Sequence, residues 1–263
     1  MKKIEHYNWK LDFESKKGKK YLIDERDKST IDDFNNKNKK NENFIIRTDL
    51  YPEGCIGNPH EAKVILLALN PGYVDESEAN NEHNWYKEHG NELEIILRDN
   101  LSHNVKNFPY YYFNDKFKDF SPGHDWIGKR TKELRNFLSE NCGVSAEQFS
   151  KRIAMIQFFP YHSKKFKDVS TDYLDVQKYH FRLVLKAMKD EKLIVCMRSL
   201  KKWDKALSTI TDGKEKLSIN DKEKLGKYPN LIQLKNYRSP YITTGNMKAG
   251  EKDFMKIIKA LKS

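Results

Sequence analysis

An unbroken apolar run at 64–69, with the sequence VILLAL, most constrains what this 263-residue chain can fold into. The turn residues Asn-Pro-Gly at 70–72 end the run at once. A short apolar run between turn signals is typical of a strand that is buried on both faces, as in a parallel sheet. The rest of the chain must then supply neighbouring strands and the helices that cover them.

Three further apolar runs predict the other strands of this sheet, at 153–156, 193–197 and 231–234. Patterns of helical periodicity lie at 91–100, 128–141, 173–189, 199–209 and 249–262. Strands that alternate with helices imply a parallel sheet covered on both faces. We therefore predict an α/β fold, a single three-layer αβα domain with a central, mainly parallel four-stranded sheet.

The first 43 residues differ in composition from the rest. They are polar, with low-complexity stretches at 16–20 (KKGKK) and 35–40 (NNKNKK). Such segments bury little apolar surface, so we expect a loosely packed arm. The predicted organisation is a polar N-terminal arm at 1–43 and an α/β domain at 44–263.

Composition argues against several classes of protein. The sequence lacks the ~18-residue apolar run that a membrane-spanning helix needs, and its basic start lacks the apolar stretch of a secretory signal. The three cysteines have no CxxC spacing. They therefore predict neither a disulfide framework nor a zinc or iron–sulfur centre. We expect a cytoplasmic protein with reduced thiols and with no metal or cofactor.

The net charge favours a polyanionic partner without establishing one. Lys and Arg number 49 against 38 Asp and Glu, which gives a formal charge of +11. Clustered basic side chains release counterions when they neutralise phosphates. A general enrichment in Lys gives the same charge through a solvated surface, so both interpretations stay open.

Ligands of parallel sheets bind in the loops beyond the carboxyl ends of the strands. In this chain these loops are 70–73, 157–163, 198–199 and 236–244, and each is rich in polar and aromatic residues. We therefore expect the functional site where these four loops meet.

Two of the loops resemble motifs of the uracil-DNA glycosylase superfamily. The strand that ends in Asn-Pro-Gly at 70–72 is similar to the first motif in the mismatch-directed and single-strand-selective branches, which have Asn rather than Asp there. Gln157 stands where the second element has a side-chain amide, usually Asn, and Pro160 follows after two residues as it does there. The chain also resembles a group of glycosylase-like bacterial proteins with a Pro-Gly-Tyr turn and a Phe-Pro-Tyr-His-Ser segment.

The late His-Pro-Ser-Pro motif of the superfamily is only partly retained. Its Ser-Pro stands at 239–240, and Tyr237 or Arg238 replaces the His. The strand at 193–197 and the helix after it match the element that precedes this motif. In order and spacing the resemblance covers about 44–262.

The resemblance implies a monofunctional DNA glycosylase that needs no metal or cofactor. Such an enzyme flips a pyrimidine out of DNA and hydrolyses its N-glycosidic bond, which leaves an abasic site. The sugar becomes oxocarbenium-like while the base leaves as an anion, so the site must stabilise negative charge and position a water. The expected substrate is uracil or a C5-modified base in duplex or single-stranded DNA, and the expected role is repair or defence against modified foreign DNA. We expect a monomer with no obligate protein partner.

In this interpretation Asn70 orients the water, while His162 and Arg238 supply a donor or positive charge to the leaving base. Gln157 presents its amide to the base edge. Gly72 stands where strict uracil enzymes carry a bulky Tyr, which predicts a pocket that tolerates C5 substituents. The other predicted base-binding residues are Leu69, Tyr73, Tyr112 and Phe158, with Tyr73 and Tyr112 as the rings expected to stack on the base.

Basic and hydroxyl side chains of the same loops are expected to contact the DNA. These DNA-binding residues are Ser163, Lys164, Lys165, Arg198, Ser239 and Tyr241. Tyr241, together with Arg238, is also a candidate wedge for the vacated base stack.

The alternative function is a non-catalytic nucleic-acid or nucleotide-binding module on the same fold, because a fold does not fix its function. The altered late motif favours this alternative. Two of the candidate site residues also have a purely structural interpretation. His162 is then a structural histidine bonded to backbone, and Gln157 is a strand-end side chain that faces solvent. The alternative for most of the aromatic residues near 109–113 is core or lid packing.

Overall fold

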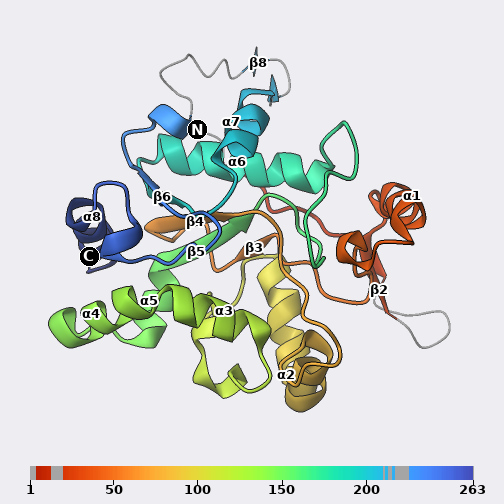
Figure 1. Ribbon diagram of the computed structural model, residues 1–263, viewed down its shortest axis with the longest axis horizontal. Helices are drawn as coiled ribbons and strands as arrows, with labels where there is room; N and C mark the ends of the chain where they lie inside the picture. The colour runs from red at the N-terminus through yellow and green to blue at the C-terminus, as the bar shows by residue number, and fades with distance from the viewer. Residues whose placement is uncertain (1–3, 13–19, 210, 213–214, 217–224, 263) are drawn as a thin grey trace.

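A five-stranded, mostly parallel sheet forms the centre of the protein (Figure 1). The computed structural model describes residues 4–12, 20–209, 211–212, 215–216 and 225–262. Across the sheet the strands are β3 (Cys55–Ile56), β5 (Ile153–Gln157), β4 (Val64–Ala68), β6 (Leu193–Cys196) and β9 (Leu231–Gln233). Neighbouring strands are parallel except for β3, which runs antiparallel to β5 at one edge.

The mixed α/β class and all four predicted strands are confirmed, but the sheet has a fifth strand that was not predicted. This strand, β3, has two residues between Gly54 and Gly57, which is too short for any periodicity to show in the sequence. Its pairing with β5 is therefore fixed by tertiary contacts, through Cys55 with Ile156 and Ile56 with Met155.

The register brings the ends of the central strands to one level. Ala68 of β4 pairs with Gln157 of β5, and Leu67 pairs with Cys196 of β6. The segments that follow these three strands therefore leave the sheet side by side, as expected for parallel strands.

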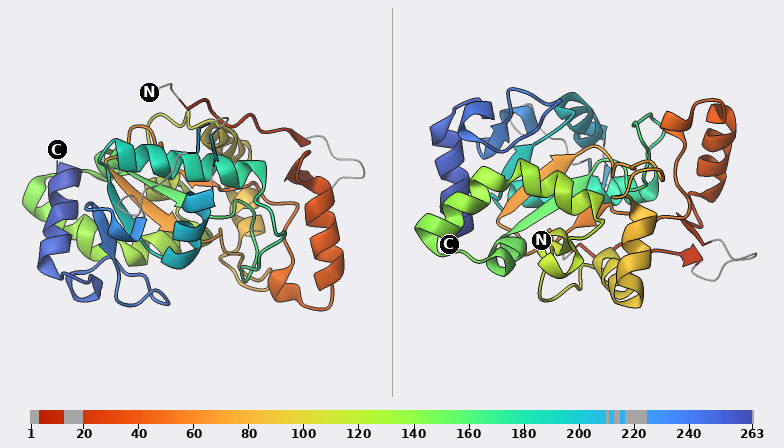
Figure 2. Two further views of the ribbon diagram at one scale, coloured as in Figure 1. Left: turned by 90° about the horizontal axis from the view of Figure 1, so that it is seen from above. Right: turned by 60° about the horizontal axis from the view of Figure 1, so that its bottom comes forward.

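Helices cover both faces of the sheet (Figures 1 and 2). On one face the apolar core includes side chains of α2 (Glu82–Leu101), α3 (Pro122–Arg130), α4 (Lys132–Cys142), α5 (Ala146–Arg152) and α8 (Glu251–Lys262). On the other face lie α6 (Asp175–Lys189) and α7 (Leu200–Thr209). Alternate residues of each buried strand face the two cores, so Leu66 contacts the first and Leu67 the second.

Short elements complete the chain. They are the strands β1 (Leu11–Asp12), β2 (Tyr21–Asp24), β7 (Thr211–Asp212) and β8 (Glu215–Lys216), and the 3₁₀ helices η1 (Glu42–Phe44), η2 (Tyr111–Phe113), η3 (Asp115–Phe117), η5 (Leu225–Lys227) and η6 (Thr244–Asn246). Within the part of the chain described, no helix is both long and apolar enough to cross a membrane.

The described part of the N-terminal segment is packed against the protein, so the expectation of a loosely packed arm is wrong there. Residues 28–38 form α1 (Lys28–Asn38), which stands beside the body of the protein (Figure 2). Ile31 and Phe34 of this helix are buried in a third apolar cluster with Phe159 and Tyr161. A stripe of two apolar residues three positions apart was hidden by the polar composition around it. Of the low-complexity stretch at 16–20, residues 16–19 lie outside the described residues.

Candidate functional site

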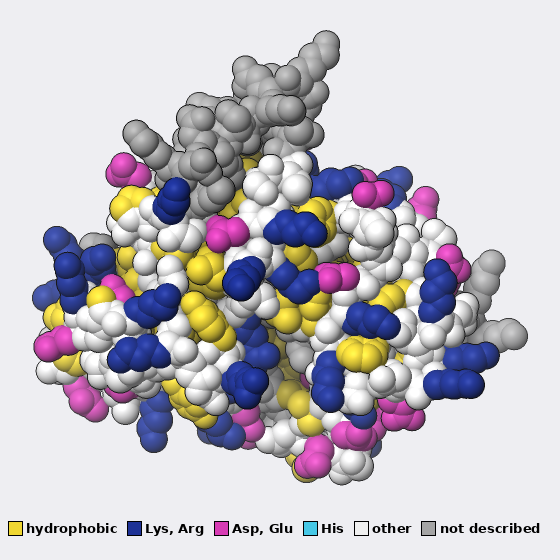
Figure 3. Space-filling view, turned by 45° about the horizontal axis from the view of Figure 1, so that its top comes forward, with side chains coloured by type: hydrophobic (Ala, Val, Ile, Leu, Met, Phe, Trp, Pro, Cys, Tyr) yellow, Lys and Arg dark blue, Asp and Glu magenta, His cyan; other side chains and the backbone are white. Residues whose placement is uncertain are grey.

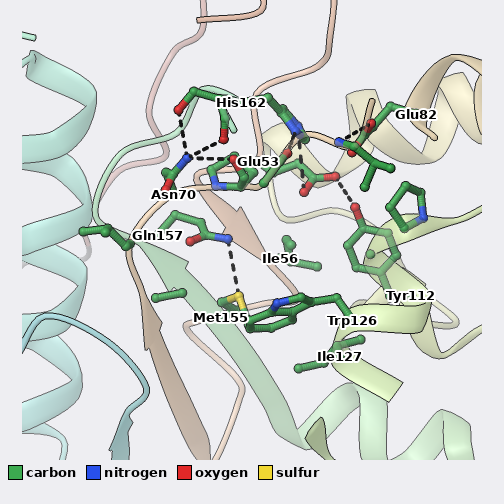
Figure 4. A pocket seen from close by; sticks show the side chains of 18 of the residues that line it. Glu53, Ile56, Asn70, Glu82, Tyr112, Trp126, Ile127, Met155, Gln157 and His162 are labelled. Carbon is green, nitrogen blue, oxygen red and sulfur yellow. Dashed lines mark hydrogen bonds and ion pairs between the residues drawn. The ribbon is translucent and has the colours of Figure 1, made fainter. Parts of the chain in front are cut away.

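A cavity of about 280 Å³ lies beyond the carboxyl ends of β4 and β5. Three of the four loops expected to meet there line it, namely those after β4, β5 and β6. The predicted site residues among its lining are Leu69, Asn70, Gly72, Tyr112, Gln157, His162, Ser163, Lys164 and Arg198. Figure 4 shows Asn70, Glu53 and His162 along one side of the cavity and Trp126 and Ile127 along the opposite side.

The carboxamide of Asn70 is held in one orientation. Its Nδ2 donates to the carbonyl oxygen of Pro71 at 2.9 Å and to Oγ and the carbonyl oxygen of Ser163 at 3.1 and 3.2 Å. Ser163 is itself buried, and its hydroxyl donates to the carbonyl oxygen of Lys165 at 3.1 Å. Because the nitrogen makes all these contacts, Oδ1 is the atom of Asn70 that can accept a hydrogen bond from a bound water.

Gln157 ends β5 with a buried amide that is incompletely satisfied. The side chain is 5% exposed, and among the residues described its Nε2 has only the weak acceptor Sδ of Met155 at 3.4 Å. Its Oε1 has no hydrogen-bond partner among the residues described. Leaving a buried amide oxygen without a partner costs about 1–3 kcal/mol, so this group is more stable when a ligand donates to it. The solvent-facing alternative for Gln157 is therefore wrong.

His162 is bonded to backbone on both sides of its ring. Nδ1 lies 2.6 Å from the carbonyl oxygen of Gly72, and Nε2 lies 3.1 Å from that of Tyr51. Nε2 is also 4.0 Å from Oε2 of Glu53. Both ring nitrogens therefore face backbone carbonyl oxygens. The ring fixes the cavity wall, and neither nitrogen is left to contact a base directly.

Sequence reasoning missed a buried carboxylate at the centre of the site. Glu53 is 4% exposed and accepts hydrogen bonds from the hydroxyls of Tyr111 at 2.9 Å and Tyr112 at 2.5 Å. The signal in the sequence was a lone charge in the otherwise uncharged stretch 50–59. Tyr112 thus lines the cavity as predicted, but its ring is stacked on Trp85 at 5.4 Å and its hydroxyl is committed to Glu53.

A second buried carboxyl group, Glu82, also lines the cavity. It lies in the first turn of α2 and accepts a hydrogen bond from the backbone amide of Val74 at 3.3 Å. Burial raises its pKa, while the charge of His162 acts in the opposite direction. No sequence motif pointed to this residue.

Aromatic and small residues shape the rest of the cavity. The indole of Trp126 is only partly buried and lies under the guanidinium of Arg130, whose Cζ is 4.2 Å from the ring centroid. A Cβ added to Gly72 would meet no atom of the described residues within 4 Å, so a side chain at position 72 would have free space there. The wall at this position is therefore open.

Positive charge lies at the edge of the cavity. Arg198 is half-buried, its Nε has no hydrogen-bond partner among the residues described, and burial lowers its pKa. Lys164 pairs with Asp75 at 2.6 Å. Figure 3 shows further Lys and Arg side chains spread over one face of the molecule, around a central hollow.

Phe158 is wrongly predicted as a base-binding residue. It is 1% exposed and packs in the second core, with its ring centroid 5.1 Å from that of Phe181 and 5.2 Å from that of Trp203. Side chains alternate between faces along a strand. Since Gln157 faces the cavity, the next residue faces α6 and α7.

The late loop stays apart from the cavity lining. Arg238, Ser239 and Tyr241 are exposed and are not among the described residues that line the cavity. Asn236 and Asn246 organise this loop: Oδ1 of Asn236 accepts from the amides of residues 238 and 239, and Nδ2 of Asn246 donates to the carbonyl oxygens of residues 239 and 241. The structure thus does not bring Arg238 to the place predicted for a catalytic residue.

Two further predicted residues lie outside the lining. The ring of Tyr73 is covered by the guanidinium of Arg47, with Cζ 4.3 Å from the ring centroid, and its hydroxyl donates to Glu76 at 3.1 Å. Lys165 is exposed, and its backbone amide donates to the carbonyl oxygen of Asn43 at 2.7 Å.

Comparison of the chain with protein-family models, curated proteins and solved structures gave no match.

Proposed function

We propose that this protein is a monofunctional DNA glycosylase that hydrolyses the N-glycosidic bond of a pyrimidine flipped out of DNA. One observation carries the proposal: Oε1 of Gln157 is buried and has no hydrogen-bond partner among the residues described. It lies in a cavity that also holds the oriented amide of Asn70. An amide edge that offers one donor and one acceptor is complementary to the hydrogen-bonding edge of a pyrimidine. The pairing of these two residues at adjacent strand ends agrees with the motif resemblance.

In the proposed reaction, residues on one side of the cavity position the water and stabilise the sugar (Figure 4). Asn70 Oδ1 accepts a hydrogen bond from the attacking water, and its fixed Nδ2 keeps that acceptor in place. The carboxylate of Glu53 stabilises the positive charge that develops on the sugar. An amide is a weak base, so most of the acceleration comes from the electrostatic environment of the leaving group.

The leaving base carries the negative charge of the transition state. Arg198 replaces Arg238 in the proposal as the cation near this base, because Arg198 lines the cavity and its guanidinium is incompletely satisfied by the residues described. His162 holds the cavity wall through the carbonyl oxygens of Gly72 and Tyr51 and does not contact the base. Trp126, which lines the cavity and is only partly buried, is the ring proposed to stack on the base.

The substrate of the proposed enzyme is uracil or a C5-modified pyrimidine in DNA, because the wall at Gly72 is open. Lys164 and Ser163 border the cavity where phosphates of a flipped nucleotide would lie. The proposal includes the three-layer αβα architecture of the superfamily, a cytoplasmic location, action as a monomer and a role in repair or defence.

The proposal is tested by an excision assay on short duplexes and single strands. Each DNA carries one uracil, one thymine mismatch or one C5-modified cytosine, and alkali then breaks the strand at any abasic site. We expect cleavage of at least one substrate, a loss of at least about 100-fold in Asn70→Ala, and full activity in the exposed control Asn104→Ala. Cleavage that Asn70→Ala leaves unchanged would contradict the assigned mechanism.

One observation favours the alternative of a non-catalytic binding module: Arg238, Ser239 and Tyr241 lie away from the cavity lining described. Such a module would bind DNA or a nucleotide with steep salt dependence. No cleavage of any substrate, with salt-sensitive binding by both the wild type and Asn70→Ala, would decide for this alternative.

A further inference from the structure

Three histidines from distant parts of the sequence meet on the surface away from the cavity. His6 belongs to the N-terminal segment, His60 to the loop between β3 and β4, and His103 follows the end of α2. One ring nitrogen of each lies within 4.8 Å of those of the other two. The ring centroids are 5.4 Å apart for His6 with each partner and 5.8 Å apart for the other pair. None of the three lines the cavity.

His103 has one bonded ring nitrogen and one without a partner among the residues described, as a metal-binding histidine requires. Its side chain is buried, with an exposed fraction of 8%, and Nε2 lies 3.0 Å from the hydroxyl of Tyr179. Nδ1 has no hydrogen-bond partner among the residues described. When Nε2–H donates to the tyrosine oxygen, Nδ1 carries the lone pair, and such an outer partner commonly fixes the tautomer of a metal-binding histidine.

The backbone holds two of the three histidines rigidly. His103 has a φ of 57°, the left-handed conformation that commonly ends a helix, and its backbone amide donates to the carbonyl oxygen of Asn100 at 3.0 Å. The carbonyl oxygens of Pro59 and His60 both accept hydrogen bonds from Nζ of Lys192, at 2.9 and 2.6 Å. His6 is exposed, so it is the ligand whose side chain can move towards the ion.

We infer that His6, His60 and His103 form a Zn²⁺ site that fastens the N-terminal segment to the body of the protein. Zinc–nitrogen bonds of about 2.0–2.1 Å at tetrahedral angles need nitrogens about 3.4 Å apart, so the nitrogens, now within 4.8 Å of one another, move together by up to about 1.4 Å around the ion. Three imidazoles suit zinc, copper or nickel rather than magnesium or calcium, which prefer oxygen. A water completes the fourth position on the exposed side.

This site could not be predicted from motifs. We expected no metal because the cysteines lack a zinc-binding spacing, and the three histidines are far apart in the sequence. Only the fold brings them together. The inference is also independent of the proposed glycosylase activity.

Zinc binding to the untagged full-length chain tests the inference. Isothermal titration and metal analysis after gel filtration should give one Zn²⁺ per chain, and Co²⁺ should give the visible absorption of a tetrahedral site. His6→Ala removes an exposed ligand, so the chain stays folded, and we expect Zn²⁺ affinity to fall at least about tenfold.

The matched control is His83→Ala. His83 is a partly exposed histidine that also has potential ligands close by, with Nε2 2.9 Å from Asp49 and Nδ1 4.0 Å from Glu76. We expect this variant to bind Zn²⁺ as the wild type does. The inference is overturned if the wild type retains no zinc, if His6→Ala binds it unchanged, or if His83→Ala rather than His6→Ala loses it.

Discussion

Gly123 of α3 and Tyr112 are packed so closely that no side chain fits between them. A Cβ at position 123 would lie 2.0 Å from Cζ and 2.5 Å from Oη of Tyr112. The hydroxyl of the same tyrosine donates to Glu53 in the cavity. A glycine in a helix outside the predicted motifs therefore positions a carboxylate of the candidate site.

Gly123→Ala should destabilise the protein by about 1–3 kcal/mol, because the methyl group forces Tyr112 or the helix to move. Thermal or urea unfolding measures this change. The control is Gly128→Ala in the same helix, where the nearest atom to the new Cβ is the end of Arg135 at 3.6 Å. That variant should be stabilised by up to about 1 kcal/mol through helix propensity. Equal effects at the two positions would contradict the packing argument.

The hydroxyl of Ser163 should matter for the proposed activity more than for stability. Ser163→Ala removes one of three acceptors of Asn70 Nδ2, at 3.1 Å, and should cost about 1 kcal/mol of stability. A less firmly held Asn70 positions the water less well, so we expect a roughly tenfold loss of excision rate. Single-turnover excision measures the rate, and the exposed Ser139→Ala serves as the control. An unchanged rate in Ser163→Ala would show that Asn70 needs no such support.

The central sheet was predictable because its signal is local. Each residue at 64–68 is buried in a parallel strand with helices over both faces, so a continuous apolar run is the expected pattern. The two-residue β3 and the helix α1 lacked such a signal. Their positions depend on pairing and packing with partners that are distant in the sequence.

The candidate site was predictable only in part, for a related reason. Asn70 and Gln157 follow directly from strand ends that the sequence predicts, and the register places these ends together. Glu53 reaches the same cavity through its contacts with Tyr111 and Tyr112, which no local pattern encodes. Alternation along β5 could have excluded Phe158 from the cavity before the structure was known.

His180 should make the fold sensitive to acid. It is buried beneath Gly54, and burial lowers its pKa to about 3, with a hydrogen bond to the backbone of Gln157 acting in the opposite direction. Because the unfolded chain binds a proton near pH 6.5 and the folded chain does not, stability falls as the pH drops from 6.5 towards 3. The loss due to this group should be about 2 kcal/mol at pH 5.

Urea unfolding of the wild type and His180→Asn at pH 7.5 and pH 5 isolates this contribution. The variant starts less stable because the ring contacts are lost, but its stability should fall less on acidification, by about 2 kcal/mol. The matched control is His89→Asn, which replaces a partly exposed histidine whose Nε2 contacts the carbonyl oxygen of Asp119. Parallel pH profiles for the wild type and His180→Asn would contradict the prediction.

The open wall at Gly72 gives a prediction about substrate range that rests on the proposed glycosylase activity. In the part of the chain that the structure describes, a Cβ at this position meets no atom within 4 Å, so Gly72→Ala should fold normally and keep the wild-type preference among bases. Gly72→Tyr places a ring in the open space, and we expect excision of C5-substituted pyrimidines to fall at least about tenfold relative to uracil. Parallel excision assays on uracil and on a C5-substituted base measure this ratio. If the wild type excises uracil but refuses every C5-substituted base, the activity stands and the argument from the open wall is wrong.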